Sequence, residues 1–203
     1  MSARQWRWRQ WGWPPRLAAL SALVVVADQL SKYWAVGALT DAFTSGGGAP
    51  RLGGRLGRFL WQRHPRPAGM VEVIAGRWRH RYVENPGAAW GFLSQVEGDW
   101  RTPFFLLVSL VSMVVVWTMV HRSAPREVLL RLGLALVFGG AVGNFIDRAR
   151  LGYVIDFIDW HLGDGFAWPT FNVADAAISS GVALLLLDSI RASKTPAQQR
   201  PQG

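Results

Sequence analysis

Carboxylate and amide side chains are concentrated in one stretch of the sequence, residues 139–175, which lies between two long apolar runs. The polar residues that define it are Asn144, Asp147, Asp156, Asn172 and Asp175. Polar groups held where apolar helices meet water cost free energy and are seldom kept without a use. We therefore expect the functional site to lie in this stretch.

Asp156 and Asp175 could act together, since the loop between two predicted helices would bring both to the same membrane boundary. Two carboxyl groups in a pocket of low dielectric constant share one proton, because both cannot comfortably ionise. The ionised member can take a proton from water while the protonated member donates a hydrogen bond to a carbonyl, as in aspartic proteases. A structural role is the alternative, because a carboxylate such as Asp175 near a helix N-terminus also stabilises the helix dipole.

Other catalytic chemistries lack their residues in this sequence. The chain has no cysteine, which excludes a disulfide framework, a thiol nucleophile and a cysteine-ligated metal. Its four histidines share no motif such as His-Glu-x-x-His, and Gly-x-Ser-x-Gly is absent. Ser31 and Lys32 are adjacent, so on a helix they point in different directions and make a poor dyad. We predict a site without a metal or a cofactor.

The composition is that of a membrane protein. Half of the 203 residues are hydrophobic, Trp occurs 12 times, and several long runs carry no charge. The length suits one domain, so residues 1–203 are predicted to form a single polytopic, all-α membrane domain. Its four predicted transmembrane helices cover residues 17–39, 103–120, 128–146 and 171–190.

A long segment at about residues 40–100 follows the first predicted helix and contains two kinds of sequence. Residues at about 43–68 are rich in Gly, Arg and Pro, and this composition predicts a flexible, disordered insert. A second hypothesis is that its arginines, Arg51, Arg55, Arg58, Arg63 and Arg66, bind anionic lipid. Residues 71–84 show β-branched and aromatic side chains in partial alternation, which predicts a short hairpin or a small extracytoplasmic β-sheet.

The net charge of +9 comes almost wholly from arginine, since the chain has only two lysines. In a membrane protein this charge sets topology and contacts anionic headgroups, and no recognition helix or aromatic platform for nucleic acid accompanies it. Basic residues cluster at 4–16, 121–131 and 191–200, which predicts that both termini are cytoplasmic. We therefore expect membrane lipids, and no nucleic acid, as partners.

Asp28 and Lys32 are charged residues within the first predicted transmembrane helix. They are four residues apart, so they share one helix face and can form an ion pair. Charges at this depth should face the helix bundle or a wet cavity and not lipid. The pair could fix helix packing, or it could act near the active site, and the spacing does not decide between the two roles.

Five motifs then occur in an order that covers most of the chain. They are Asp28-Gln29-x-x-Lys32, Asn85-x-Gly87-Ala88-Ala89, Gly139-Gly140-x-x-Gly143-Asn144-x-x-Asp147-Arg148, Val154-x-Asp156-Phe157 and Phe171-Asn172-x-Ala174-Asp175. In these motifs and their order the chain resembles lipoprotein signal peptidase (signal peptidase II), the bacterial inner-membrane aspartic protease family. Two features depart from the family pattern: Trp90 stands where Phe is usual, and the Gly/Arg-rich insert lengthens the first outer loop.

The resemblance implies that Asp156 and Asp175 are the catalytic aspartates. It implies supporting or substrate-binding roles for Asp28, Lys32, Asn85, Gly87, Gly140, Asn144, Asp147, Arg148 and Asn172. It also implies four transmembrane helices with a small outer β-sheet that cradles the substrate. The expected reaction is removal of the signal peptide from a diacylglyceryl-modified prolipoprotein by a cut before the lipidated cysteine, with inhibition by the cyclic peptide globomycin.

Two other classes of function remain as alternatives. A small transporter or proton-relay protein would also use membrane aspartates, but its sites should lie near the bilayer midplane. Asp156 and Asp175 are expected at one face, and only Asp28 and Lys32 lie deeper. A non-catalytic membrane scaffold would tolerate Asn at both aspartate positions.

Overall fold

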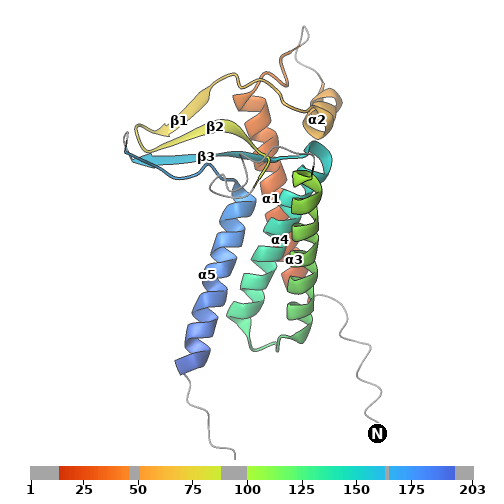
Figure 1. Cartoon of the computed structure of the whole chain (residues 1–203), viewed down its shortest axis with the longest axis vertical. Coiled ribbons are helices and arrows are strands. Elements are labelled where there is room, and N and C mark those ends of the chain that lie inside the picture. The colour runs from red at the N-terminus through yellow and green to blue at the C-terminus, as the bar shows by residue number, and fades with distance from the viewer. Residues whose placement is uncertain (1–13, 46–50, 88–99, 163–164, 195–203) are drawn as a thin grey trace, which may run out of the picture.

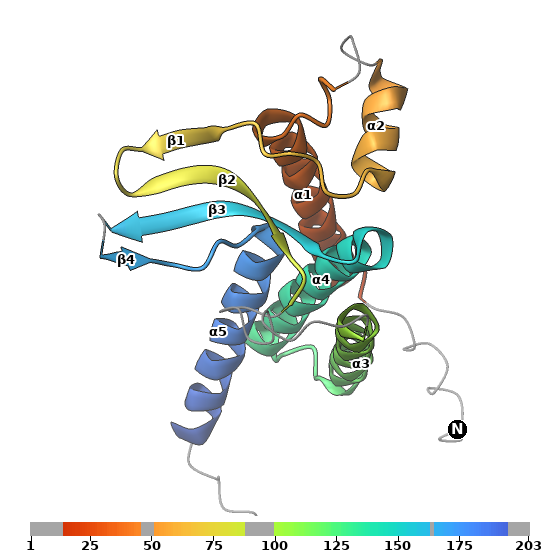
Figure 2. The same cartoon turned by 45° about the horizontal axis from the view of Figure 1, so that its top comes forward.

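The computed structural model describes residues 14–45, 51–87, 100–162 and 165–194. In these residues four long helices form a bundle, and an antiparallel sheet lies across one end of it, called here the sheet end (Figure 1). The long helices are α1 (Pro15–Leu39), α3 (Arg101–Arg122), α4 (Val128–Leu151) and α5 (Val173–Lys194). A shorter helix, α2 (Leu52–Trp61), lies beside the sheet end of α1 and α4 (Figure 2).

Helices occur at all four predicted positions, with ends that differ by a few residues from the prediction. Among the described residues, three helices are long and apolar enough to cross a membrane: Arg101–Arg122, Val128–Leu151 and Val173–Ser193. α1 has 25 residues but contains Asp28 and Lys32, whose charges lower its mean hydropathy. The fold is therefore a mostly helical membrane fold with a small antiparallel sheet.

The surface of α3 shows how the bundle meets lipid. Large apolar side chains are exposed along its whole length, including Leu107, Val111 and Val114. An exposed apolar surface of this extent is typical of contact with a membrane and not with water. α5 has the same character, since Val182, Leu186 and Ile190 are also exposed.

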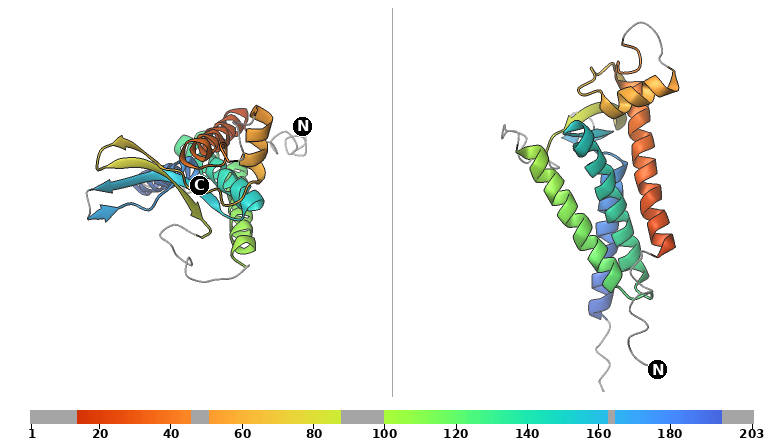
Figure 3. Two further views of the ribbon diagram at one scale, coloured as in Figure 1. Left: turned by 90° about the horizontal axis from the view of Figure 1, so that it is seen from above. Right: turned by 90° about the vertical axis from the view of Figure 1, so that its right-hand side faces the viewer.

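α4 is the centre of the bundle, because it packs against α1, α3 and α5 (Figure 3). Glycines allow this close approach. A Cβ on Gly140 would lie 2.5 Å from the carbonyl oxygen of Ala174 in α5, and one on Gly139 would lie 2.8 Å from that of Ser21 in α1. The small-residue pattern that predicted close helix packing thus marks the contact surfaces of α4.

A left-handed glycine ends α4 and directs the chain into the sheet. Gly152 has φ +89°, a conformation that L side chains rarely adopt, and its N–H donates to the carbonyl of Arg148 at 3.0 Å. The next strand begins two residues later, at Val154. The helix therefore ends five residues beyond the predicted end at residue 146.

The sheet has the order β1-β2-β3-β4, and all neighbouring strands are antiparallel. β1 (Met70–Ile74) and β2 (Trp78–Asn85) form the predicted hairpin, which is confirmed. The link between the third and fourth long helices contains two strands that the sequence did not predict, β3 (Val154–Leu162) and β4 (Phe166–Ala167). β3 pairs with β2, a partner far away in the sequence, so no local pattern announced it.

The prediction of a disordered insert at about 43–68 was also wrong for its described part, since it contains α2. Phe59 of α2 is buried against Tyr33 and Phe43, with the Tyr33 and Phe59 ring centroids 5.4 Å apart. Apolar contact with the bundle therefore stabilises a helix that a Gly-rich composition disfavours. Residues 46–50 of the insert lie outside the described residues.

We expect Gly140→Ala to lower the temperature at which the protein unfolds in detergent. The added Cβ would overlap the Ala174 carbonyl and Ile178 of α5, and overpacking of this kind costs about 1–3 kcal/mol. Intrinsic Trp fluorescence during heating measures the change. The control is Gly57→Ala in α2, where a Cβ meets nothing within 4 Å and a small gain in stability is expected. Equal melting of the two variants would contradict the tight contact between α4 and α5.

Candidate active site

A cavity of about 770 Å³ lies where the sheet meets α4 and α5. Asp156 enters it from β3 and Asp175 from the first turn of α5. Asn85, Asn144 and Arg148 line it as well, and so do the aromatic rings of Trp160, Trp168 and Phe171. The two aspartates, 19 residues apart in the sequence, are thus brought into one cavity.

Asp175 is positioned by the start of its own helix. The Asp175 N–H donates to Oδ1 of Asn172 at 2.9 Å, and the Asn172 N–H donates to Oδ2 of Asp175 at 3.3 Å. This reciprocal pair is a capping box, with Asn172 as the N-cap and Asp175 three residues later. The second carboxylate oxygen, Oδ1, accepts a hydrogen bond from Nδ2 of Asn144 at 2.8 Å. Two amides therefore fix the orientation of this carboxylate.

Asp156 is held by amides from two other elements. Its Oδ1 accepts from Nδ2 of Asn172 at 2.7 Å, and its Oδ2 accepts from Nδ2 of Asn85 in β2 at 2.9 Å. Asn172 therefore contacts both aspartates, one through its side-chain amide and the other through its oxygen and backbone. The strand pairing of β2 with β3 places Asn85 beside Asp156.

The environment of Asp156 favours its protonated form. Burial, first of all, and the negative charge of Asp175, second, raise the pKa of Asp156 to about 7, although the hydrogen bonds from Asn85 and Asn172 favour the ionised form. The side chain is 1% exposed. Near neutral pH this carboxyl group is therefore divided between its acid and its base form.

Behind the cavity lies a fully buried charge cluster, in which Lys32 binds two carboxylates. Its Nζ lies 2.8 Å from Oδ2 of Asp28 and 2.8 Å from Oδ2 of Asp147. It also donates to Oδ1 of Asn144 at 3.2 Å, and Asn144 in turn contacts Asp175. The pair of Asp28 and Lys32 is thus connected to Asp175 through Asn144. Of the two roles left open for the pair, this connection supports the one near the site.

The remaining predicted residues have distinct positions. Arg148 lines the cavity, donates through Nη2 to the carbonyl of Gly87 at 3.0 Å, and lies over the ring of Phe105 at 5.2 Å. Gly87 also lines the cavity, and its N–H donates to Oδ1 of Asn85 at 3.0 Å. Gly140 lies at the contact of α4 with α5, outside the cavity lining. Ala88, Ala89 and Trp90 lie outside the described residues.

Two residues of the charge cluster were not among the predicted site residues. Gln29 donates through Nε2 to Oδ2 of Asp28 at 3.1 Å and to Oδ1 of Asp147 at 3.2 Å. Arg150 donates through Nη2 to Oδ1 of Asp147 at 2.9 Å, so two cations balance two carboxylates. The spacing of Asp147 and Arg150, three residues apart, was a usable sequence signal.

The site can support acid–base chemistry with two carboxyl groups in different environments. Asp156 is almost fully buried and holds a raised pKa, while Asp175 lies at a helix N-terminus, which favours negative charge. Within the described ranges, no three His, Cys, Asp or Glu side chains are grouped so that they could hold a metal ion.

Solved structures define the class of protein to which this fold belongs. The chain matches a bacterial membrane enzyme, determined by the in meso method at 2.3 Å resolution, with a TM-score of 0.67 and 23% identity over 93% of this chain and 95% of the other. A second bacterial membrane enzyme, at 1.9 Å, matches with a TM-score of 0.62 and 26% identity over 90% of this chain and 95% of the other. The fold is thus that of a bacterial membrane enzyme.

The family follows from the sequence comparisons, since residues 20–191 match the family described as signal peptidase (SPase) II. A lipoprotein signal peptidase of Anaeromyxobacter sp. (strain Fw109-5) is 45% identical over 84% of this chain and 82% of the relative. That of Coxiella burnetii (strain Dugway 5J108-111) is 38% identical over 83% of this chain and 85% of the relative. The chain belongs to the signal peptidase II family.

The raised pKa of Asp156 predicts an alkaline limit to activity. With Asp156 as the candidate general acid, the loss of its proton above about pH 7 removes that acid, so kcat/KM should fall as pH rises. Asn85→Ala removes a hydrogen bond that stabilises the ionised form, so the alkaline limb should move to higher pH. The measurement is the pH profile of kcat/KM on a synthetic lipopeptide.

Thr170→Val is the matched control for this profile. Thr170 lines the same cavity and accepts a hydrogen bond from Arg81 at 2.9 Å, but it has no described contact with Asp156. Its substitution should leave the position of the alkaline limb unchanged. The assignment of the acid to Asp156 is wrong if Asn85→Ala leaves the limb where it was or moves it to lower pH.

Proposed function

We propose that Asp156 and Asp175 are the catalytic pair with which this signal peptidase II, an aspartic endopeptidase, removes signal peptides from prolipoproteins. The observation that carries this proposal is the contact of Asn172 with both carboxylates inside one cavity. Family membership supports peptidase chemistry and does not favour the transporter alternative. The position of the pair at the sheet end, and not near the middle of the helices, also supports a peptidase.

In the proposed reaction, Asp175 acts as the general base and Asp156 as the general acid. Asp175 takes a proton from water, the water oxygen attacks the scissile carbonyl carbon, and Asp156 gives its proton to the carbonyl oxygen. The tetrahedral intermediate then collapses: the C–N bond breaks, the proton held by Asp175 passes to the leaving nitrogen, and one hydroxyl of the intermediate returns a proton to Asp156 as the new carboxyl group forms. The raised pKa of Asp156 supports this division of roles.

We propose that the substrate is a diacylglyceryl-modified prolipoprotein and that the cut falls just before its lipidated cysteine. The signal helix would lie in the groove of the bundle, with the lipid chains in the bilayer and the scissile carbonyl between the two aspartates. The peptide must be extended there, because a helical peptide bond is shielded by its own hydrogen bonds. Asn144, Asn172 and Arg148, which surround the aspartates, would hold the peptide backbone and the pair in place.

We further propose that α1 is a fourth transmembrane helix. Its 25 residues would span roughly 37 Å at about 1.5 Å per residue, more than the bilayer core of about 30 Å. Asp28 and Lys32 are completely buried in the protein, while Leu23 and Leu30 on the same helix are 64% exposed. The charged side chains thus face the bundle and apolar ones face outward, as a spanning helix requires.

The proposed location is the bacterial inner membrane, with one polytopic domain, both termini in the cytoplasm and the site near the extracytoplasmic face. The start of α1, the link between α3 and α4, and the end of α5 lie at the end of the bundle opposite the sheet (Figure 1). Arg16, Arg122 and Arg126 lie at that end, and positive charge favours the cytoplasmic side. Globomycin is the expected inhibitor, so cleavage should stop when it is added in excess.

Asp156→Asn and Asp175→Asn should each abolish cleavage of a diacylated prolipoprotein, because each removes one member of the acid–base pair. Both variants should still insert into membranes, since Asn keeps the size of the side chain. A gel-shift assay on one lipidated precursor, with and without globomycin, measures cleavage.

Asp188→Asn is the control, because it makes the same substitution on α5 outside the cavity lining. It should cleave at the rate of the unchanged protein. Near-normal turnover by either Asp156→Asn or Asp175→Asn would remove that residue from the catalytic pair.

A further inference from the structure

One face of α2 carries a row of exposed leucines. Leu52, Leu56 and Leu60 are spaced by four residues, which places them on the same side of a helix. Their exposed fractions are 68%, 43% and 39%. In water such a row would leave large apolar side chains in contact with solvent.

The contacts of Phe59 and Arg58 with the rest of the protein fix which side of α2 faces inward. Phe59 is buried against the bundle, and its backbone carbonyl accepts a hydrogen bond from Nη1 of Arg150 at 2.5 Å. Nη1 of Arg58 donates to the carbonyls of Ala42 at 2.9 Å and Ser45 at 2.7 Å. Both aromatic and polar contacts therefore fix the rotation of the helix about its axis.

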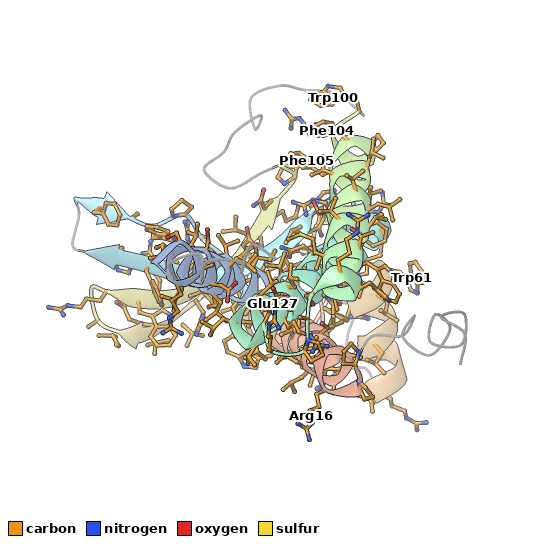
Figure 4. The ribbon with its side chains drawn as sticks, turned by 90° about the horizontal axis from the view of Figure 1, so that it is seen from below. Arg16, Trp61, Trp100, Phe104, Phe105 and Glu127 are labelled. Carbon is orange, nitrogen blue, oxygen red and sulfur yellow. The ribbon has the colours of Figure 1, made fainter. Side chains whose placement is uncertain are left out.

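The location of α2 brings the row to the membrane. The helix lies across the sheet end and not along the bundle (Figure 3, right). Seen from the opposite end of the bundle, α2 projects beyond the outline of α1 and α4, and Trp61 at its end points away from the protein (Figure 4). Trp61 is 73% exposed, and a Trp ring suits the headgroup region. The helix therefore overhangs the lipid that surrounds the spanning helices.

We propose that α2 is an interfacial helix whose row of Leu52, Leu56 and Leu60 is buried in the bilayer surface beside the bundle. Amphipathic helices of this kind bury an apolar face in the boundary between headgroups and acyl chains. The charges agree with this occupant: no acidic residue lies in the first turn, and the exposed Arg51 and Arg63 flank the two ends. Anionic headgroups would neutralise both arginines.

This proposal changes the lipid-binding residues that the composition of the insert suggested. Arg58 is committed to the carbonyls of Ala42 and Ser45, and Arg66 pairs with Asp41 at 3.0 Å. Arg55 lies over the ring of Phe43 at 6.0 Å. Arg51 and Arg63, at the two ends of the helix, are the arginines placed to meet headgroups, although Arg63 also donates to the carbonyl of Arg150 at 3.5 Å. The leucine row contributes the apolar contact.

A second copy of the chain is a less suitable occupant for this row. Stable protein interfaces bury roughly 800 Å² on each partner, which is far more than three leucines of a short helix offer. The bilayer, in contrast, is necessarily present next to the bundle. The test below separates the two, because contact between copies depends on protein density in the membrane and contact with lipid does not.

The absence of cysteine from the natural sequence allows a direct test. Leu56→Cys and Gly57→Cys, each in the full chain, are labelled with nitrobenzoxadiazole and reconstituted in vesicles of phosphatidylcholine and phosphatidylglycerol. The two positions differ by about 100° around the helix at 3.6 residues per turn. A Cβ at Gly57 meets nothing within 4 Å, so the control position accepts a side chain.

The dye at position 56 should emit at shorter wavelength than the dye at 57, with stronger quenching by doxyl-labelled lipid and weaker quenching by aqueous iodide. Both labelled variants should still cleave a prolipoprotein, which shows that they are folded; the dye readout itself does not depend on catalysis. Equal iodide quenching at the two positions would overturn the proposal. It would also be overturned if shielding at position 56 disappeared when the protein was diluted with lipid, because a second copy would then cover the row.

Discussion

The site depends on the buried contact of Lys32 with Asp28 and Asp147. These side chains are wholly removed from water, and each ion loses hydration worth several kcal/mol, so none is tolerable without its partners. Asp28 also accepts the N–H of Ala174 at 3.0 Å, and Asp147 accepts the N–H of Ile155 at 3.2 Å. The residues that accept these bonds therefore fix the backbone immediately before each candidate catalytic aspartate. One lysine thus organises the starts of two elements that are separate in the sequence.

Glycine makes room for this polar centre within an apolar bundle. A Cβ on Gly143 would lie 2.6 Å from Oδ2 of Asp28, so any larger residue would displace the carboxylate that binds Lys32. The same helix face allows α1 and α5 to approach α4 closely. The close packing of α1, α4 and α5 and the geometry of the charge cluster therefore both require small residues on α4. Their outer surfaces remain apolar, which allows the polar centre to be carried within a membrane.

The charge cluster also contacts α2. Arg150 binds Asp147 and, through a second nitrogen, the carbonyl of Phe59 in α2, and its guanidinium lies 4.2 Å from the centre of the Phe59 ring. The seating of α2 and the neutralisation of Asp147 therefore share one side chain. Through Arg150, the helix formed by the Gly/Arg-rich insert is therefore connected to the charge cluster behind the site.

Local sequence patterns were sufficient to predict the long helices and the hairpin of β1 and β2, and the loop between two helices predicted that Asp156 and Asp175 lie close together, as they do in one cavity. Long apolar runs and alternating β-branched residues predict helices and strands from short stretches of sequence. The order of the motifs indicated the family. Asn85 and Asp156, in contrast, are 71 residues apart, and their hydrogen bond exists only because β2 pairs with β3. The sequence of one strand does not show which distant strand it will pair with.

Contacts with distant residues also explain why part of the Gly/Arg-rich insert forms a helix. The composition of α2 favours disorder, but burial of Phe59 in one cluster with Tyr33 and Phe43, together with the contact of Arg150, stabilises the helix. The sequence by itself determined which groups can do chemistry and at which end of the helices they lie. Only the tertiary structure decided which amides orient them, how far Asp156 is buried and which cations balance the carboxylates, because hydration and pairing depend on neighbours from other elements.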